Sequence, residues 1–184
     1  MSDEKAFSCY NKIMTKKIKI TATAENLAQA KALLDLGIDS LYIGERDYAL
    51  RLPHAFTWDE IRELTELAHA AGAQVTVAVN ALMHPEKMAT IKPYLDFLQA
   101  IKVDQIAVGD TGVIFVLNRD KYQLPYIYDA STMVTSSRQV NFWGQQGAIG
   151  AVLSRELPKA ELIKMAANLE IFGEILVYGA TIIH

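Results

Sequence analysis

The sequence predicts an α/β fold, a parallel β/α barrel of the TIM type that is incomplete in this chain. β-rich runs alternate with amphipathic helices from residue 17 onward, and the starts of these runs are spaced almost regularly. Most of the runs are nearly continuous apolar stretches, which are typical of parallel strands covered on both faces. With 51% hydrophobic and 21% charged residues among 184, the chain has the composition of a folded globular domain.

Seven strands and six helical crossovers are expected. The predicted strands are Ile18–Ala22, Ser40–Gly44, Gln74–Asn80, Gln105–Gly109, Tyr126–Ala130, Ile149–Ser154 and Glu174–Tyr178. Strict alternation of apolar and polar residues is mostly absent from them. This pattern favours parallel pairing, in which a helix connects each strand to the next.

The first helices carry recognisable start and stop signals. An amphipathic segment spans residues 25–36 and ends at Gly37. The next helix begins at Thr57-Trp58-Asp59-Glu60, which has the spacing of a capping box, and Gly72 is its expected stop.

Two prolines predict where later helices begin or bend. Pro158 stands at a helix start, where its missing N–H costs nothing. Pro93 interrupts the segment 86–101, so we expect either a kink or two short helices there.

The alternation by itself is also compatible with a doubly wound open sheet. No G-x-G-x-x-G or G-x-x-x-x-G-K-[ST] phosphate loop follows any predicted strand, and the near-regular spacing favours the barrel. A complete barrel takes about 250 residues, so we expect this chain to be a fragment that lacks the last β/α unit. Its open strand edges would need a cover from another chain, a swapped segment or the missing part.

We divide the chain into an N-terminal extension, residues 1–16, and a truncated barrel domain, residues 17–184. The first thirteen residues have no clear period and are either an upstream addition or a genuine disordered or capping tail. They contain Cys9, the single cysteine, which excludes an intramolecular disulfide or a Cys-rich metal site and fits a reducing cytoplasm.

Composition also excludes several classes of partner. The net charge of −3 offers no broad electrostatic footprint for nucleic acid. No apolar run approaches the roughly 20 residues of a membrane helix, and the N-terminus lacks the apolar region of a secretory signal. We therefore expect a cytoplasmic protein that does not enter a membrane.

Polar residues at the carboxyl ends of the strands are the candidate site, because the loops after the strands form the site of a parallel barrel. The predicted catalytic residues are three acids that could transfer protons or orient arginines. The predicted substrate-binding residues include two arginines, each able to clamp a carboxylate or phosphate through paired hydrogen bonds. These candidates are Glu45, Asp110 and Glu156 for catalysis and Arg51, Asn80, His84 and Arg155 for binding; no metal site is expected.

Each candidate also has a structural interpretation. Asp110 precedes Thr111-Gly112 and is suited to cap a helix. Arg155 and Glu156 could form a structural ion pair, and Asn80 could shape a turn. His84 precedes Pro85 and could be an ordinary turn residue.

The usual protease motifs are absent. The sequence has no H-E-x-x-H, no G-x-S-x-G and no usable Cys–His pairing. Nothing in the chain therefore supplies a conventional protease mechanism.

Taken in order, short segments near the strand ends resemble the collagenase-like peptidases of unknown catalytic type, the U32 family. They run through nearly the whole chain: AENL at 24–27, GIDSLYIG at 37–44, AVNALMH at 78–84, VGDTGV at 108–113, FW at 142–143, VLSREL at 152–157 and VYGA at 177–180. The stretch IGERDYALRL at 43–52 is most similar to the shorter bacterial members. This resemblance implies prephenate-dependent hydroxylation of wobble uridine in tRNA to 5-hydroxyuridine, often by paired subunits.

The resemblance further implies that the arginines bind the carboxylates of a prephenate-type donor. It also implies a homo- or hetero-oligomer in which a paralogous subunit helps to bind tRNA, since the net charge here is negative. Alternatives are a peptidase acting on collagen-like substrates and a non-catalytic partner of a paralogue that carries an iron–sulfur cluster.

Members commonly have a cysteine shortly after the glycine of the seventh strand, which begins that cluster. Here Gly179-Ala180 is followed by TIIH, and such clusters usually demand four thiolates. The cluster is therefore not carried over, and no cofactor is evident in this chain.

Overall fold

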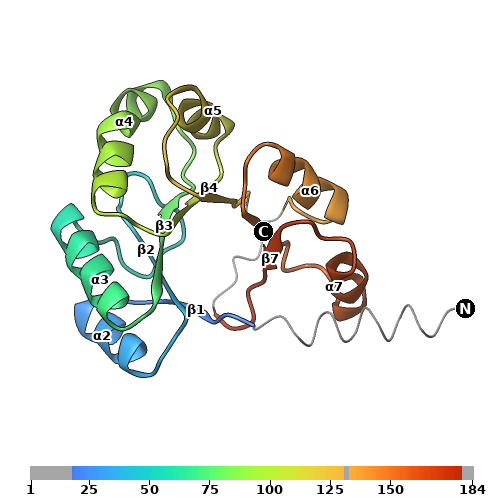
Figure 1. Ribbon diagram of the computed structural model, residues 1–184, viewed down its shortest axis with the longest axis horizontal. Helices are drawn as coiled ribbons and strands as arrows, with labels where there is room; N and C mark the ends of the chain where they lie inside the picture. The colour runs from blue at the N-terminus through green and yellow to red at the C-terminus, as the bar shows by residue number, and fades with distance from the viewer. Residues whose placement is uncertain (1–17, 131–132, 180–184) are drawn as a thin grey trace, which may run out of the picture. The chain divides into compact units, whose positions relative to one another are not determined.

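The computed structural model describes residues 18–130 and 133–179. Seven strands and six helices alternate within these ranges (Figure 1). The chain forms two compact units that divide after Tyr126. Within each unit the paired strands run parallel and follow one another in chain order. These features confirm the predicted fold class, an incomplete parallel β/α barrel. The predicted extension, residues 1–16, lies outside the described residues.

Unit 1 contains four strands and four helices, and its helices lie along one side of the strands (Figure 1). Its elements are β1 (Thr21–Thr23), α2 (Leu27–Asp35), β2 (Ser40–Gly44), α3 (Trp58–Ala70), β3 (Gln74–Val79), α4 (Pro85–Ala100), β4 (Gln105–Val108) and α5 (Thr111–Arg119).

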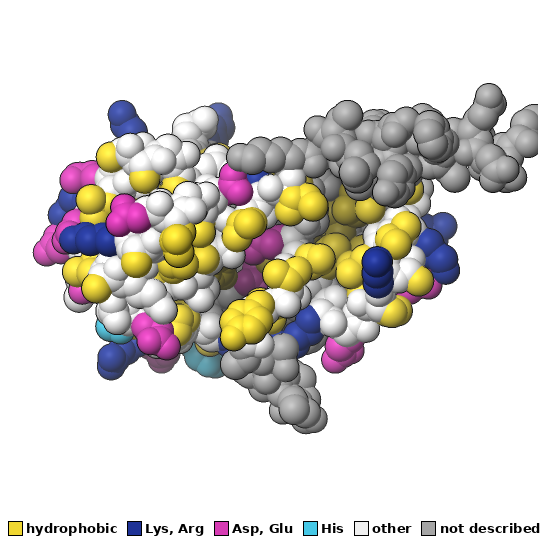
Figure 2. Space-filling model, turned by 90° about the horizontal axis from the view of Figure 1, so that it is seen from below, with side chains coloured by type: hydrophobic (Ala, Val, Ile, Leu, Met, Phe, Trp, Pro, Cys, Tyr) yellow, Lys and Arg dark blue, Asp and Glu magenta, His cyan; other side chains and the backbone are white. Residues whose placement is uncertain are grey.

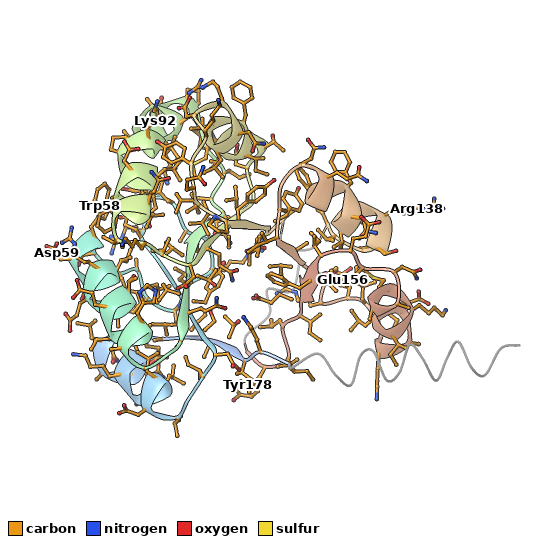
Figure 3. All side chains as sticks on the ribbon, viewed as in Figure 1. Trp58, Asp59, Lys92, Arg138, Glu156 and Tyr178 are labelled. Carbon is orange, nitrogen blue, oxygen red and sulfur yellow. The ribbon has the colours of Figure 1, made fainter. Side chains whose placement is uncertain are left out.

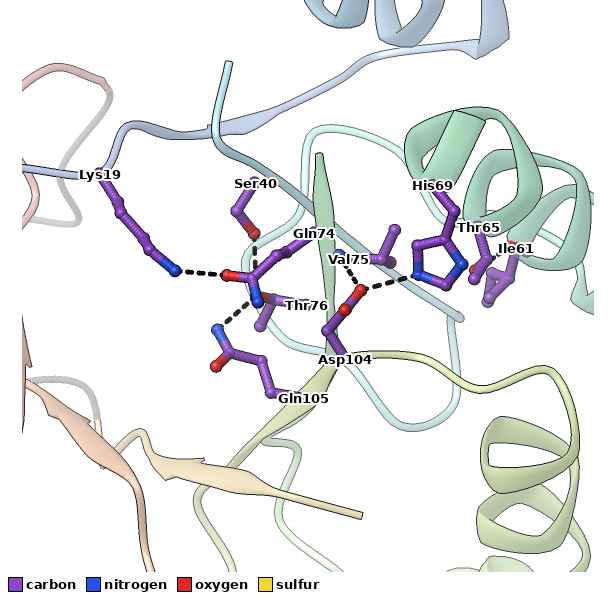
Figure 4. A network of polar contacts seen from close by, with 10 residues as sticks. All are labelled: Lys19, Ser40, Ile61, Thr65, His69, Gln74, Val75, Thr76, Asp104 and Gln105. Atoms are coloured by element: carbon purple, nitrogen blue, oxygen red, sulfur yellow. Dashed lines mark hydrogen bonds and ion pairs between the residues drawn. The ribbon is translucent and has the colours of Figure 1, made fainter. Parts of the chain in front are cut away.

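The two faces of the unit 1 sheet differ in chemistry. Val75 points toward α3, whereas Ser40, Thr76 and Gln105 lie together on the opposite side (Figure 4). The Thr76 hydroxyl contacts the Ser40 hydroxyl at 3.2 Å and accepts a hydrogen bond from Gln105 Nε2 at 2.8 Å. The strands therefore alternate more than their apolar runs indicate: apolar side chains pack against the helices and polar ones face the other way.

Unit 2 begins within β5 (Tyr126–Tyr128). It continues through α6 (Ser137–Gln145), β6 (Gly150–Val152), α7 (Lys159–Ala166) and β7 (Phe172–Glu174). Its core combines β6 and the residue that follows it with both helices, through the buried residues Val140, Ala151, Leu153 and Met165.

The predicted position of the last strand is wrong. The strand is Phe172–Glu174, not 174–178, and residues 175–178 form no strand. Two glycines explain the register. A Cβ on Gly150 would lie 2.4 Å from the Phe172 ring, and one on Gly173 would lie 2.9 Å from Leu153 Cδ1. These close contacts between β6 and β7 determine which residues pair, whereas the apolar run Ile175–Tyr178 does not.

The helix signals are largely confirmed. Thr57 caps α3: its hydroxyl accepts the Glu60 N–H at 3.3 Å, while the Glu60 carboxylate accepts the Thr57 N–H at 2.8 Å. Gly72 follows the helix end with a φ of +75°. However, α4 runs unbroken through Pro93, so the expectation of two short helices is wrong. Pro93 lies on the exposed side of α4.

Candidate functional site

The candidate residues of unit 1 lie on the three loops that follow β2, β3 and β4. Glu45 and Arg51 belong to the β2–α3 loop, Asn80 and His84 to the β3–α4 loop, and Asp110 to the short β4–α5 connection. Because β2, β3 and β4 are parallel neighbours, these loops emerge at one edge of the sheet.

Hydrogen bonds join the three loops into one structure. Asn80 Oδ1 accepts the N–H of Leu50 at 2.8 Å, and the carbonyl of Tyr48 accepts the N–H of Ala81 at 3.0 Å. Asp110 Oδ2 accepts the N–H of Met83 at 3.2 Å. The side chains of Asn80 and Asp110 thus hold backbone groups of neighbouring loops in place.

Tyr48 anchors the β2–α3 loop to α4. Its hydroxyl donates to the carbonyl of Thr90 at 3.1 Å, and its ring stacks on Tyr94 with centroids 4.3 Å apart. Gly44 gives the loop room to fold back over the end of β2, since a Cβ there would lie 2.8 Å from the Cβ of Ala49. The loop is therefore a packed element held by the core.

The Tyr94 hydroxyl is buried beside this loop, without a hydrogen-bond partner in the described part of the chain. Burial raises the pKa of Tyr94 well above its ordinary value, and the nearby Glu45 carboxylate raises it further. The phenol therefore stays protonated.

Both candidate acids of unit 1 accept backbone hydrogen bonds. Glu45 Oε2 accepts the N–H of Asp47 at 2.7 Å. Asp110 Oδ1 accepts the N–H of Gly112 at 2.7 Å, which confirms its predicted role as the cap of α5. Their catalytic roles stay predictions.

Arg51 and His84, in contrast, lie on the outside of these loops. Arg51 is exposed and has a φ of +59°, a left-handed conformation that is uncommon for a residue with a side chain. His84 is exposed and precedes α4 without capping it through its imidazole. Their substrate-binding roles stay predictions.

The remaining candidates lie in unit 2. Arg155 is half-buried and Glu156 is exposed, and both follow β6 in the loop before α7, where Figure 3 labels Glu156. The N–H of Glu156 donates to Ser154 Oγ at 3.4 Å. These two residues follow a strand, as predicted, and their proposed roles in binding and catalysis are untested by this geometry.

Sequence reasoning missed two acids of unit 2, Asp129 and Glu174. Asp129 directly follows β5, and Glu174 ends β7, where it pairs in register with Val152 of the intervening strand. Burial raises the pKa of Glu174, and the charge of Asp129 raises it further. Asp129 could have been found as the first polar residue after a strand. Glu174 was missed because it was assigned to the beginning of a strand.

A polar network at the opposite end of the unit 1 strands has a structural role (Figure 4). Asp104 accepts the N–H of Val75 at 2.8 Å and lies 2.9 Å from His69 Nε2. Lys19 donates to Gln74 at 2.7 Å. These residues surround the amino ends of the strands, the end that stabilises a β/α barrel and carries no active site.

Neither a metal site nor a membrane helix is found in residues 18–130 and 133–179. No three His, Cys, Asp or Glu side chains gather there to hold a metal ion. Likewise, none of the helices in those ranges has the length and apolar character needed to cross a membrane.

The fold and the polar strand ends define a β/α-barrel protein whose candidate site is built from loops at the carboxyl edge. The model of Peptidase family U32 matches residues 25–184, and the chain belongs to this family.

Two relatives from Bacillus subtilis strain 168 are similar over most of the chain. The tRNA hydroxylation protein P2 is 33% identical over 90% of this chain and 54% of its own length. The tRNA hydroxylation protein P1 is 31% identical over 92% of this chain and 40% of its own length. The chain thus spans about half the length of these relatives or less.

A solved structure of a U32 peptidase has the same fold. It superposes with a TM-score of 0.71 at 14% identity, covering 88% of this chain and 69% of the other. At this identity the likeness concerns the fold alone.

Proposed function

We propose that this chain is a subunit of an enzyme that hydroxylates uridine in tRNA with a prephenate-type donor. The observation that carries the proposal is the similarity to two tRNA hydroxylation proteins across at least 90% of the chain. The family match at residues 25–184 contains every candidate site residue. The interlocked loops of unit 1 support it, because they provide a preorganised polar edge where a β/α barrel places its chemistry.

Arg155 is the proposed clamp for the carboxylates of the donor. It is half-buried in the loop after β6, so a bound carboxylate would be partly shielded from water, which would strengthen its hydrogen bonds. Glu45, Asp110 and Glu156 are the proposed proton-transfer groups. Asn80 and His84 are proposed to contact the substrate from the β3–α4 loop.

We further propose that the enzyme is cytoplasmic and oligomeric. A paralogous subunit is the proposed partner. A non-catalytic role beside such a paralogue is the second candidate. It predicts activity only in the co-purified complex.

Mass spectrometry of tRNA nucleosides from a strain that lacks the gene tests the proposal. We expect 5-hydroxyuridine derivatives to disappear and to return with the wild-type gene. An Arg155→Ala gene should not restore them, whereas Arg138→Ala, which removes an exposed arginine of α6 in the same unit, should. Arg155→Lys should restore them only weakly, because an ammonium cannot form the paired hydrogen bonds of a guanidinium. An unchanged nucleoside profile in a strain without a redundant pathway would contradict the proposal.

A further inference from the structure

We propose that Arg46 and Arg51, on the β2–α3 loop of unit 1, form a docking site for the sugar-phosphate backbone of RNA. The choice of tRNA as the RNA rests on the proposed function. The site itself rests on the charges, the exposure and the support of this loop.

The acidic side chains around the two arginines accept backbone hydrogen bonds or lie near a lysine. Glu45 accepts the N–H of Asp47 at 2.7 Å, and Asp47 lies 4.0 Å from the ammonium of Lys87. Asp110 accepts two backbone N–H groups. None of these three carboxylates forms an ion pair with Arg46 or Arg51 in residues 18–130 and 133–179.

The four arginines of unit 1 form two groups that differ in their contacts. Arg62 contacts Asp59 at 2.8 Å, and Arg119 contacts Asp120 at 2.7 Å, both on the helical side of the unit. Arg46 and Arg51 are exposed and make no ion pair with any residue in the ranges 18–130 and 133–179. The carboxyl edge of unit 1 thus carries two exposed guanidinium groups, five residues apart in sequence, and each can bind an anion.

The loop that carries them is rigidly supported. The N–H of Leu50, next to Arg51, is held by Asn80 at 2.8 Å, and the buried Tyr48 lies between the two arginines in sequence. Arg51 itself keeps a φ of +59°. Such a conformation is unfavourable for a residue with a Cβ and persists when the surroundings impose it. Because the loop is already held in place, it loses less conformational entropy when a ligand binds.

The exposure of both arginines favours an extended polyanion over a small carboxylate. Pockets for small molecules bury most of the ligand surface, whereas a nucleic acid backbone stays largely solvated and gains affinity by releasing counterions to exposed arginines. Figure 2 shows acidic and basic side chains interspersed on the face that it draws, without a broad patch of either sign. The half-buried Arg155 remains the proposed partner of the donor.

Fluorescence anisotropy with a labelled tRNA anticodon stem-loop tests this site in the full 184-residue chain. The variant Arg46→Ala/Arg51→Gly removes both charges, and glycine at 51 keeps the left-handed backbone unstrained. Each lost phosphate contact should lower the slope of log affinity against log salt by about 0.9. We expect the slope to fall by about 1.8 and the affinity at low salt to fall at least tenfold. The control Arg62→Ala/Arg119→Ala makes the same change in net charge and should leave both nearly unchanged.

An unchanged salt slope in the Arg46→Ala/Arg51→Gly variant would overturn the inference, as would a wild-type chain that does not bind the RNA. Loss of prephenate binding with intact RNA binding would also overturn it, since the arginines would then serve the donor. The two proposals fail separately: nucleoside analysis judges hydroxylation, and the salt slope judges the docking site. Normal tRNA modification in the deletion strain together with the expected slope change would leave an RNA-docking site without the hydroxylation role.

Discussion

Asn80 illustrates at the residue scale how one side chain supports several candidate groups. It lies directly after β3, and its carbonyl oxygen holds the N–H of Leu50 in the preceding loop. Its amide also donates to the Tyr42 hydroxyl at 3.4 Å. The sequence predicts that Asn80 contacts substrate or shapes a turn, and its position after β3 is compatible with both roles. The structure adds a contact between two loops that neither interpretation included.

Asn80→Ala should lower the free energy of unfolding by about 1 kcal/mol, because the Leu50 N–H loses its acceptor. Asn80→Asp retains an acceptor oxygen at the same position and should lose less. Urea unfolding of the two variants checks this. Equal losses would show that the hydrogen bond to Leu50 contributes nothing and that packing of the side chain decides.

The raised pKa of Glu174 predicts how the stability of the protein depends on pH. Its pKa is raised above the ordinary value of 4.5 by burial and then by Asp129. The folded state therefore holds the proton more tightly than the unfolded state, and stability falls as pH rises from that ordinary value through the raised pKa. Glu174→Gln removes the carboxyl group that titrates and therefore removes this loss of stability. The variant should match the wild type near pH 4 and be more stable at pH 7.

Thermal unfolding from pH 4 to pH 8 would check the Glu174 prediction. Glu170→Gln, which makes the same charge change at an exposed position, serves as the control and should follow the wild-type pH profile. A Glu174→Gln variant that is less stable than the wild type at pH 7 would show instead that the ionised carboxylate is stabilised by a partner.

At the element scale, α4 joins the site to the core. It buries Ile91, Tyr94, Leu95 and Leu98 on one face. Tyr94 stacks on Tyr48 of the β2–α3 loop, and Trp58 of α3 lies 4.7 Å from the Phe97 ring centroid. This aromatic packing compensates for Pro93, which removes one backbone hydrogen bond from the middle of the helix.

Pro93→Ala should stabilise the protein by about 1–3 kcal/mol, because alanine restores an N–H that can bond to the carbonyl of Ala89. Pro85→Ala at the first position of the same helix should have little effect, since that N–H has no intrahelical acceptor. Denaturant unfolding measures both. A loss of stability in Pro93→Ala would show that α4 is bent at Pro93 to fit its neighbours.

On the scale of the whole molecule, the family name and the chemistry of the chain point in different directions. The chain belongs to Peptidase family U32. However, it contains no conventional protease motif, and the described residues include no candidate metal cluster. Each loop that carries a candidate arginine also carries a candidate acid: Glu45 lies with Arg51 after β2, and Glu156 lies with Arg155 after β6.

The purified chain should therefore not cleave gelatin. Electrophoresis after incubation with Zn²⁺, with Ca²⁺ and with a chelator checks this. Fragments that survive the Arg155→Ala and Arg51→Gly substitutions would reveal a peptidase centre elsewhere in the chain. Fragments that vanish with either substitution would assign peptide cleavage to the candidate site.

The amino-acid sequence was enough to predict the fold class, strand 40–44, the cap at Thr57 and the cap at Asp110. These features depend on local periodicity and on hydrogen bonds between residues at most a few positions apart, so a single segment contains the information. Sequence reasoning could not predict the register of β7, the bond between Asn80 and Leu50, or the proximity of Glu174 to Asp129. Each of these depends on contacts between residues 20 or more positions apart. Such contacts depend on shape and on burial by other elements, which no single segment contains.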